Sequence, residues 1–366
     1  GIPLFYPFIS PRAKAEVIDT LESRWIGQGP KVDIFESKFK EQLVPDNFPI
    51  ATGSGTDSLH LAYLLADITE GDEVITPVFT CTATNLPILY AGATPIFADI
   101  DPYSMNINVN DIEHRINEKT KAIVAVDYGG LPANYKKLKE ICKKHNLFLI
   151  SDAAQSIGTK YNYEPISNIA DFTAYSFQAI KTITTGDGGM LVMKDKSFLD
   201  KSKRLRWFGI DRSSKQKGTW ENDIREIGYK YQMSDLAACL GISALEELDT
   251  LIAHRQALFK AYKSEIIISD IKVISPNFSD GTVISPWLCT VLVKEGRIDL
   301  MKKLRSHGIE SAQVHYRNDR YSVFGGRKSD LPIMDEMEEK YLVLPLHHKI
   351  SVEQVHFISS LINEGW

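Results

Sequence analysis

Cysteine is scarce in this chain, and the few cysteines present are spread apart. Four occur among 366 residues, and none falls in a CxxC pair. This count argues against a disulfide framework and against a cysteine-based zinc site, so we predict no metal ligands. It also favours a reducing compartment, for which the cytoplasm is the natural choice.

Long apolar runs and an excess of positive charge are missing as well. No run approaches the roughly 18 apolar residues of a membrane-spanning helix, and the opening stretch GIPLFYPFIS has no basic start like that of a signal peptide. The formal net charge of −5 argues against nucleic acid and anionic membrane as partners. Hydrophobic residues at 43% and charged residues at 24% predict a soluble globular protein.

Short apolar segments alternate with helix-like segments between residues 72 and 195. Such alternation predicts an α/β fold, with a mainly parallel sheet covered by helices on both faces and ligands bound at the carboxyl ends of the strands. The expected strands are 73–77, 94–101, 121–127, 147–152 and 171–177, and the expected helices are 82–92, 110–120 and 134–146.

The pattern changes in the last third of the chain. One or two long helices are expected over 235–265, followed by a strand at 286–294 and helices at 299–309 and 351–365. This order predicts a smaller α+β domain after a helical connection. We therefore expect a large domain over 1–245 and a small domain over 246–366.

Three features that could carry chemistry lie where strands of the predicted sheet end. A Gly-Ser-Gly-Thr turn at 53–56 opens a helix, and its free amides and hydroxyls suit an anion; alternatively Thr56 simply caps the helix. Asp152 ends a buried strand, where a carboxylate needs a cation or several donors; alternatively it caps the next segment. Lys181 lies in a loop of small residues, where a lowered pKa would make it a nucleophile; alternatively it is a surface lysine.

Together these features match the three anchoring requirements of pyridoxal 5'-phosphate. The phosphate needs amides and hydroxyls, the ring nitrogen needs a carboxylate, and the aldehyde needs an amine. We therefore predict pyridoxal 5'-phosphate as the cofactor.

A series of motifs along nearly the whole chain resembles a known family. These are SRWIGQGPKVDIFESKF, ATGSGTDSLHLA, GDEVITPVFTCTATNLPILYAGATPIFADID, LISDAAQSIGTKY, AYSFQAIKTITTGDGG and IGYKYQMSDLAACLG. In order and spacing they are similar to the sugar aminotransferases of the DegT/DnrJ/EryC1/StrS group, which have the aspartate aminotransferase fold (fold type I). The resemblance implies a three-layer αβα large domain and a homodimer whose active sites use residues of both subunits.

The resemblance also implies roles for individual residues. Lys181 matches the lysine that binds the cofactor covalently, and Asp152 matches the acid that pairs with the ring nitrogen. The further cofactor contacts that it implies are Gly55, Thr56, Gln155 and Ser176.

Three positions depart from the family pattern. Gln178 replaces a frequent histidine. Lys230 replaces the asparagine that reaches the phosphate from the other subunit, and we expect it to bind that phosphate as a point charge. Cys81 stands where many members place an aromatic ring that stacks on the cofactor, which leaves Phe79 as a candidate for stacking.

The function implied is transfer of an amino group from L-glutamate to a nucleotide-linked keto sugar, most often a 4-keto-6-deoxyhexose, in amino-sugar biosynthesis for surface polysaccharide. Two alternatives remain: a dehydratase of the same fold, although its subgroup has histidine in place of Lys181, and a non-catalytic regulator that binds cofactor or nucleotide sugar. The candidate substrate contacts are Trp25, Gln28, His315, Tyr316, Arg317 and Arg320, with Arg206 and Arg212 as additional positive charges for a diphosphate.

Overall fold

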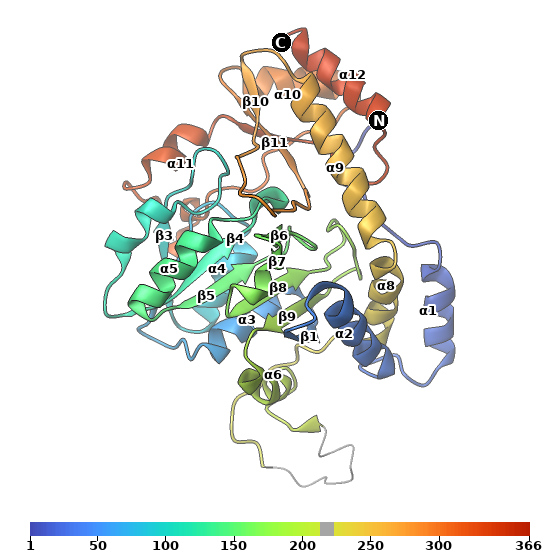
Figure 1. The fold of residues 1–366 in the computed structure, drawn as a ribbon, viewed down its shortest axis with the longest axis vertical. Coiled ribbons are helices and arrows are strands. Elements are labelled where there is room, and N and C mark those ends of the chain that lie inside the picture. Colours follow the sequence, from blue (N-terminus) through green and yellow to red (C-terminus); the bar gives the residue numbers. More distant parts are fainter. Residues whose placement is uncertain (213–222) are drawn as a thin grey trace.

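A seven-stranded sheet forms the centre of the molecule (Figure 1). The computed structural model describes residues 1–212 and 223–366. The strand order is β1-β9-β8-β5-β4-β2-β3, and β9 runs antiparallel to both of its neighbours while the remaining pairs are parallel. The strands are β1 (Phe48–Thr52), β2 (Glu73–Pro77), β3 (Thr94–Ala98), β4 (Thr120–Val126), β5 (Phe148–Asp152), β8 (Phe172–Ser176) and β9 (Gly189–Met193).

Helices cover both faces of this sheet. They are α1 (Ala13–Glu22), α2 (Pro30–Leu43), α3 (Gly55–Leu65), α4 (Thr82–Tyr90), α5 (Tyr135–His145), α6 (Leu199–Leu205) and α8 (Asp235–Leu245). Two short strands, β6 (Lys160–Tyr161) and β7 (Glu164–Pro165), pair with each other as a hairpin and not with the strands of the central sheet.

The alternation of side chains along the strands explains the layers. In β1, Ile50 packs into the core under α3 and α4, whereas the next residue, Ala51, packs into the core under α2 and α8. In β5, Ile150 joins the first of these cores and Leu149 joins a third core under α5. Because successive side chains of a strand point to opposite faces, both faces are apolar and both need helices. The predicted three-layer α/β architecture is confirmed.

The predicted helix over 110–120 is wrong. Only two short 3-10 turns form there, Val109–Asp111 and Glu113–Arg115. The Asp111 carboxylate accepts hydrogen bonds from the Asp99 amide at 2.6 Å and from Arg115 Nε at 2.8 Å. Arg115 also binds Asp330, far along the chain. These tertiary contacts hold the segment in turns despite its helical composition.

A second, three-stranded antiparallel sheet lies toward the C-terminus. Its order is β10-β11-β12, and the long helix α9 packs beside α12 next to it (Figure 1). Its elements are α9 (Leu248–Glu265), β10 (Ile271–Val273), β11 (Cys289–Val293), α10 (Arg297–Ser306), α11 (Pro332–Met337), β12 (Tyr341–Leu344) and α12 (Val352–Asn363). The division into 1–245 and 246–366 stays a prediction, and the first residues pack with this second part, since Ile2 bridges Ile309.

The two sheets are joined where the turn after β4 meets the segment before β11. The Trp287 amide donates to the Gly129 carbonyl at 2.7 Å. Gly130 has φ +88°, and a Cβ there would lie 1.9 Å from the Ser285 carbonyl oxygen. Only glycine permits this backbone conformation and this close approach. Along residues 1–212 and 223–366, no helix combines the length and the apolar character needed to cross a membrane.

Gly130→Ala tests this junction against a matched control. Gly71 has φ +91°, nearly the same conformation, but a Cβ there would meet no atom within 4 Å. Both substitutions strain the backbone, and Gly130→Ala adds a clash. We expect urea denaturation to show a free energy of unfolding about 1 to 3 kcal/mol lower for Gly130→Ala than for Gly71→Ala. Equal stability of the two variants would contradict this junction.

Candidate functional site

Asp152, the last residue of β5, is buried at the carboxyl edge of the parallel strands. Its Oδ2 accepts a hydrogen bond from Thr84 Oγ1 at 2.7 Å, and its Oδ1 accepts one from the Ala154 amide at 3.1 Å. Burial raises the pKa of Asp152, while these two donors and the positive charge of Lys181 oppose the rise. Turns rather than a helix follow Asp152, so the alternative of a helix cap is wrong.

Lys181 lies in the loop that connects β8 to β9. Ser176 and Gly189, at the two ends of the loop, are paired across the strands, and the Phe177 amide donates to the Gly188 carbonyl at 2.8 Å. Burial lowers the pKa of Lys181, whereas Cys81 and Asp152 act in the opposite direction. Lys181 is therefore not an ordinary solvated lysine: it is partly buried and close enough to Asp152 for their charges to interact.

Trp287 is a neighbour of Lys181 that the sequence did not reveal. Lys181 Nζ lies 3.9 Å from the centroid of the Trp287 ring. The indole stacks on Phe5, with centroids 5.5 Å apart, and on His315, with centroids 6.3 Å apart. Its Nε1 donates to the Ile180 carbonyl at 2.8 Å. In the sequence this tryptophan belongs to an apolar strand pattern, which gives no signal of a role beside Lys181.

The glycine-rich turn before α3 meets the end of β8. Ser54, not Thr56, caps the helix, because its Oγ accepts the Asp57 amide at 3.0 Å. A Cβ on Gly55 would lie 2.8 Å from the Cβ of Ser176, so the glycine allows the helix N-terminus to approach that strand end. The N-terminus of α3 thus lies directly against Ser176 at the end of β8, an arrangement of free amides and a hydroxyl that suits a phosphate.

Gln155 and His315 lie on the same side of the site as Lys181. Gln155 Oε1 accepts the Gly129 amide at 2.8 Å, and its Nε2 lies 3.4 Å from His315 Nε2. Burial, together with the positive charge of Lys181, lowers the pKa of His315 to about 3. His315 is therefore neutral near pH 7 and presents an uncharged imidazole to the site.

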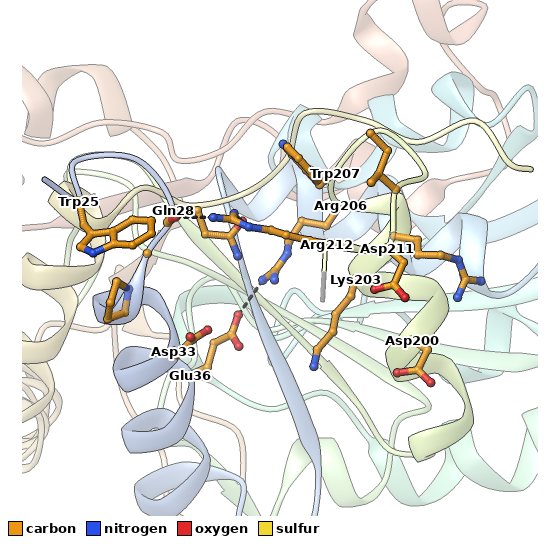
Figure 2. A pocket seen from close by; sticks show the side chains of 14 residues that line it. Trp25, Gln28, Asp33, Glu36, Asp200, Lys203, Arg206, Trp207, Asp211 and Arg212 are labelled. Carbon is orange, nitrogen blue, oxygen red and sulfur yellow. Dashed lines mark hydrogen bonds and ion pairs between the residues drawn. The ribbon is translucent and has the colours of Figure 1, made fainter. Parts of the chain in front are cut away.

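Trp25 and Gln28 line a separate cavity of about 430 Å³, shown in Figure 2. Arg212 donates to Gln28 Oε1 at 2.6 Å, and Arg206 donates to Glu36 Oε1 at 2.6 Å. The lining of this cavity contains neither Lys181 nor Asp152. Within one chain, the structure therefore does not bring these predicted substrate residues to the lysine.

Lys230, Tyr316 and Arg320 are exposed. Lys230 Nζ lies 5.4 Å from the centroid of the Phe208 ring, and the Arg320 guanidinium carbon lies 4.4 Å from that of Tyr316. The predicted phosphate contact of Lys230 was expected across a subunit interface, and it stays a prediction.

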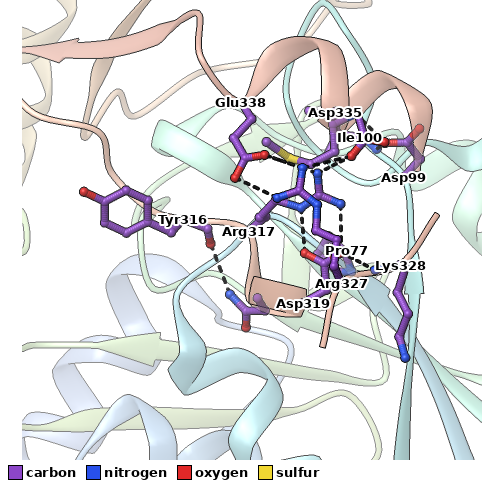
Figure 3. Close-up of polar contacts among 12 residues, drawn as sticks. Pro77, Asp99, Ile100, Tyr316, Arg317, Asp319, Arg327, Lys328, Asp335 and Glu338 are labelled. Atoms are coloured by element: carbon purple, nitrogen blue, oxygen red, sulfur yellow. Dashed lines mark hydrogen bonds and ion pairs between the residues drawn. The ribbon is translucent and has the colours of Figure 1, made fainter. Parts of the chain in front are cut away.

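Two residues that the sequence analysis singled out, Arg317 and Phe79, are buried in the protein interior. Arg317 forms a bidentate ion pair with Asp319, at 2.6 and 2.8 Å, and also binds Asp335 and Glu338 (Figure 3). With its side chain fully buried and its donors engaged by carboxylates, its position argues against the predicted substrate contact.

Phe79 is only 1% exposed and makes edge contacts with the rings of Tyr128 and Tyr341, each with centroids 4.9 Å apart. It is therefore a core residue, which argues against stacking on a cofactor. Cys81, by contrast, is partly exposed and near enough to Lys181 to affect its pKa.

Comparisons with known proteins agree on one family. The sequence model described as "DegT/DnrJ/EryC1/StrS aminotransferase family" matches residues 7–363. The GDP-perosamine synthase of Escherichia coli O157:H7 is 34% identical over 366 residues, covering 99% of this chain and 98% of that protein. The crystal structure of sugar aminotransferase CalS13 from Micromonospora echinospora superimposes with a TM-score of 0.94, at 28% identity and full coverage of both chains. A Streptococcus pneumoniae protein solved in a PLP form has a TM-score of 0.92 at 28% identity, covering 99% of this chain and 98% of that one.

The described residues fit pyridoxal phosphate, the cofactor of this family. A buried acid at a strand end, a partly buried lysine and a glycine whose Cβ would fill the space beside Ser176 are the three elements that the cofactor needs.

Gly55→Ala tests the phosphate cradle. The added Cβ would clash with Ser176, so we expect pyridoxal phosphate to bind at least about ten-fold more weakly to the apoprotein in an absorbance titration. Gly27→Ala is the matched control, because a Cβ there would meet nothing within 4 Å. Unchanged affinity in Gly55→Ala would show that the cofactor phosphate lies elsewhere.

The pH dependence of acylation tests the pairing of Lys181 with Asp152. The apoprotein would be treated with acetic anhydride over a pH series, and the labelling of Lys181 followed by mass spectrometry. Because burial lowers the pKa of Lys181, its labelling midpoint should fall below that of the exposed Lys137 in the same sample. Asp152→Asn removes a charge that favours the ammonium form, so the midpoint should move lower still; an unchanged midpoint would refute the interaction.

Proposed function

The chain belongs to the DegT/DnrJ/EryC1/StrS aminotransferase family and is a PLP-dependent aminotransferase, and from this premise we propose its reaction. It transfers an amino group from L-glutamate to a nucleotide-linked keto sugar. The acceptor is a 4-keto-6-deoxyhexose, and the product serves amino-sugar biosynthesis for surface polysaccharide in the cytoplasm. The observation that carries the proposal is the convergence of Lys181, Asp152 and the Gly55–Ser176 cradle at one edge of the sheet.

The relatives support the choice of acceptor. Two GDP-perosamine synthases, from Escherichia coli O157:H7 and Vibrio cholerae, are 34% and 32% identical over almost the full chain. Their names describe the making of an amino sugar attached to a nucleotide. A Saccharopolyspora spinosa relative at 27% identity is a dTDP-4-dehydro-2,3,6-trideoxy-D-glucose 4-aminotransferase. We transfer to this chain the amino sugar on a nucleotide that the first two names describe and the 4-dehydro acceptor that the third name prints.

Asp152 and Lys181 have different roles in the proposed reaction. When bound, pyridoxal phosphate supplies a ring that accepts the electrons of the carbon losing its proton. Asp152 holds a proton on the ring nitrogen, and its burial strengthens that interaction. Lys181 moves the proton of the substrate carbon, as general base and then general acid, and the lowering of its pKa by burial favours the neutral amine that a base requires.

Other residues orient the cofactor. The Gly55 and Thr56 amides and the Ser176 hydroxyl hold the phosphate at the N-terminus of α3. Gln155, fixed by the Gly129 amide, contacts the ring hydroxyl. In a dimer, the exposed Lys230 would hold the phosphate of the neighbouring site as a point charge.

A homodimer with shared active sites explains why the predicted substrate residues form two groups. Trp25 and Gln28 line the cavity of Figure 2, whereas His315, Tyr316 and Arg320 lie in another segment. Exposed apolar side chains occur beside Trp25 and at two separate described positions: Ile26 at 52%, Phe208 at 40% and Ile227 at 82% exposure. Exposed apolar residues of this kind are typical of subunit interfaces. A partner's Trp25 surface placed against the 315–320 segment would complete the acceptor site.

A panel of acceptors tests the proposed reaction. The protein would be incubated with L-glutamate and nucleotide-linked 4-keto or 3-keto sugars, and the products identified by NMR. We expect an amino sugar from a 4-keto-6-deoxyhexose and loss of at least about 10³-fold in rate for Lys181→Ala, since its proton transfer and covalent tether both disappear.

The alternatives predict other outcomes in the same experiment. A deoxygenated sugar formed without consumption of glutamate would indicate the dehydratase. Function that survives Lys181→Ala would indicate a binding protein. An amino sugar from 3-keto acceptors alone would correct the position of amination.

A further inference from the structure

A buried chain of hydroxyl groups leads to the acid of the active site. Thr80 Oγ1 and Thr84 Oγ1 lie 2.7 Å apart, and Thr84 Oγ1 lies 2.7 Å from Asp152 Oδ2. An ionised carboxylate only accepts, and each hydroxyl carries a single hydrogen. Thr84 therefore donates to Asp152, and Thr80 donates to Thr84. The direction of both hydrogen bonds follows from the charge at Asp152.

We call the hydrogen-bonded series Thr80–Thr84–Asp152 the hydroxyl relay. Asn318, far along the chain, fixes the backbone around Thr80. Its amide donates to the Val78 carbonyl at 2.6 Å, and its Nδ2 donates to the Thr80 carbonyl at 2.7 Å. Its Oδ1 accepts from Asn85 Nδ2 at 2.8 Å. Asn318 is 0% exposed, and it bonds both sides of the turn between β2 and α4.

The neighbours of Asn318 explain why it holds one position. Arg317 and Asp319, on either side, are both fully buried and bound to each other (Figure 3). Asp319 also accepts the Lys328 amide at 3.0 Å, and Arg317 binds Asp335 and Glu338 on or beside α11. A buried, multiply paired arginine is a strong constraint on local backbone.

We infer that Thr84 and Asn318 are positioning residues for Asp152: Thr84 orients its carboxylate and keeps it ionised, and Asn318 holds Thr80 and Thr84 in place. The inference rests on the proposed role of Asp152 at the ring nitrogen. Its consequence is that the C-terminal part of the chain helps to set the charge of the cofactor ring without touching it. In this inference Arg317, which the sequence analysis expected to contact substrate, supports Asn318 through its buried ion pair with Asp319.

Thr84→Val tests the relay, because valine keeps the volume and removes the donor. The readout is the pH midpoint of the visible absorption band of the bound cofactor. Without the Thr84 hydrogen bond, Asp152 keeps the proton on the ring nitrogen less firmly. The ring then withdraws less electron density from the Lys181 nitrogen bound to the cofactor, and this nitrogen becomes more basic. We expect the midpoint to rise by roughly one pH unit and kcat to fall roughly ten-fold. Thr84→Ser, which restores the hydroxyl, should return both values toward those of the unsubstituted protein.

Thr173→Val is the matched control, since Thr173 is equally buried and its hydroxyl has no hydrogen-bond partner among the described residues. It should leave the midpoint unchanged. Asn318→Ala should shift the midpoint in the same direction as Thr84→Val, by a smaller amount. An unshifted midpoint in Thr84→Val, or an equal shift in Thr173→Val, would overturn the inference. If the midpoint stays normal while the amino sugar still forms, the relay fails and the proposed function stands.

Discussion

Burial of the Asp152 carboxylate is the constraint on which the site depends. A charge at the end of a buried strand is costly unless donors and an opposite charge compensate it. Here Thr84, the Ala154 amide and Lys181 all provide that compensation. Three separate parts of the chain must therefore meet at one carboxylate. The pKa of Asp152 is still raised, so these contacts do not offset the full cost of burying the charge. A cationic ring nitrogen would offset the rest. The burial that makes this carboxylate costly to fold is therefore also what makes it bind the ring nitrogen strongly.

The features that the sequence predicted are those set by local chemistry. Runs of β-branched or aromatic residues predicted β2, β3, β4, β5 and β8, and the segments after β2 and β4 predicted α4 and α5, so the α/β layers followed from this pattern. Asp152 and the turn at Gly55 were identifiable because parallel strands end at a common edge. Lys181 stood out through its small neighbours. Their roles came from the family resemblance, which adds information that spacing does not contain.

The features that the sequence missed depend on residues distant along the chain. Arg317 looked like a substrate contact; its bidentate partner Asp319 is two residues away, but the burial of both side chains and the further partners Asp335 and Glu338 depend on the fold. Trp287 looked like part of a strand, yet its ring lies under Lys181. The segment 110–120 has a helical composition, but contacts with Asp99 and Asp330 hold it in turns. In each case a tertiary contact outweighed a local preference.

The closed geometry of the lysine-bearing loop has a consequence for divergence. Since Ser176 and Gly189 pair directly, the chain enters and leaves this loop at one place on the sheet. The residues between them are also tied into the fold, since Phe177 and Ile183 are buried in the core under α2 and α8 and the Ile180 carbonyl accepts the Trp287 indole N–H. An insertion or deletion in this loop would therefore displace the Lys181 amine from Asp152 even where the strand pairing is kept, so we expect its length to be restricted.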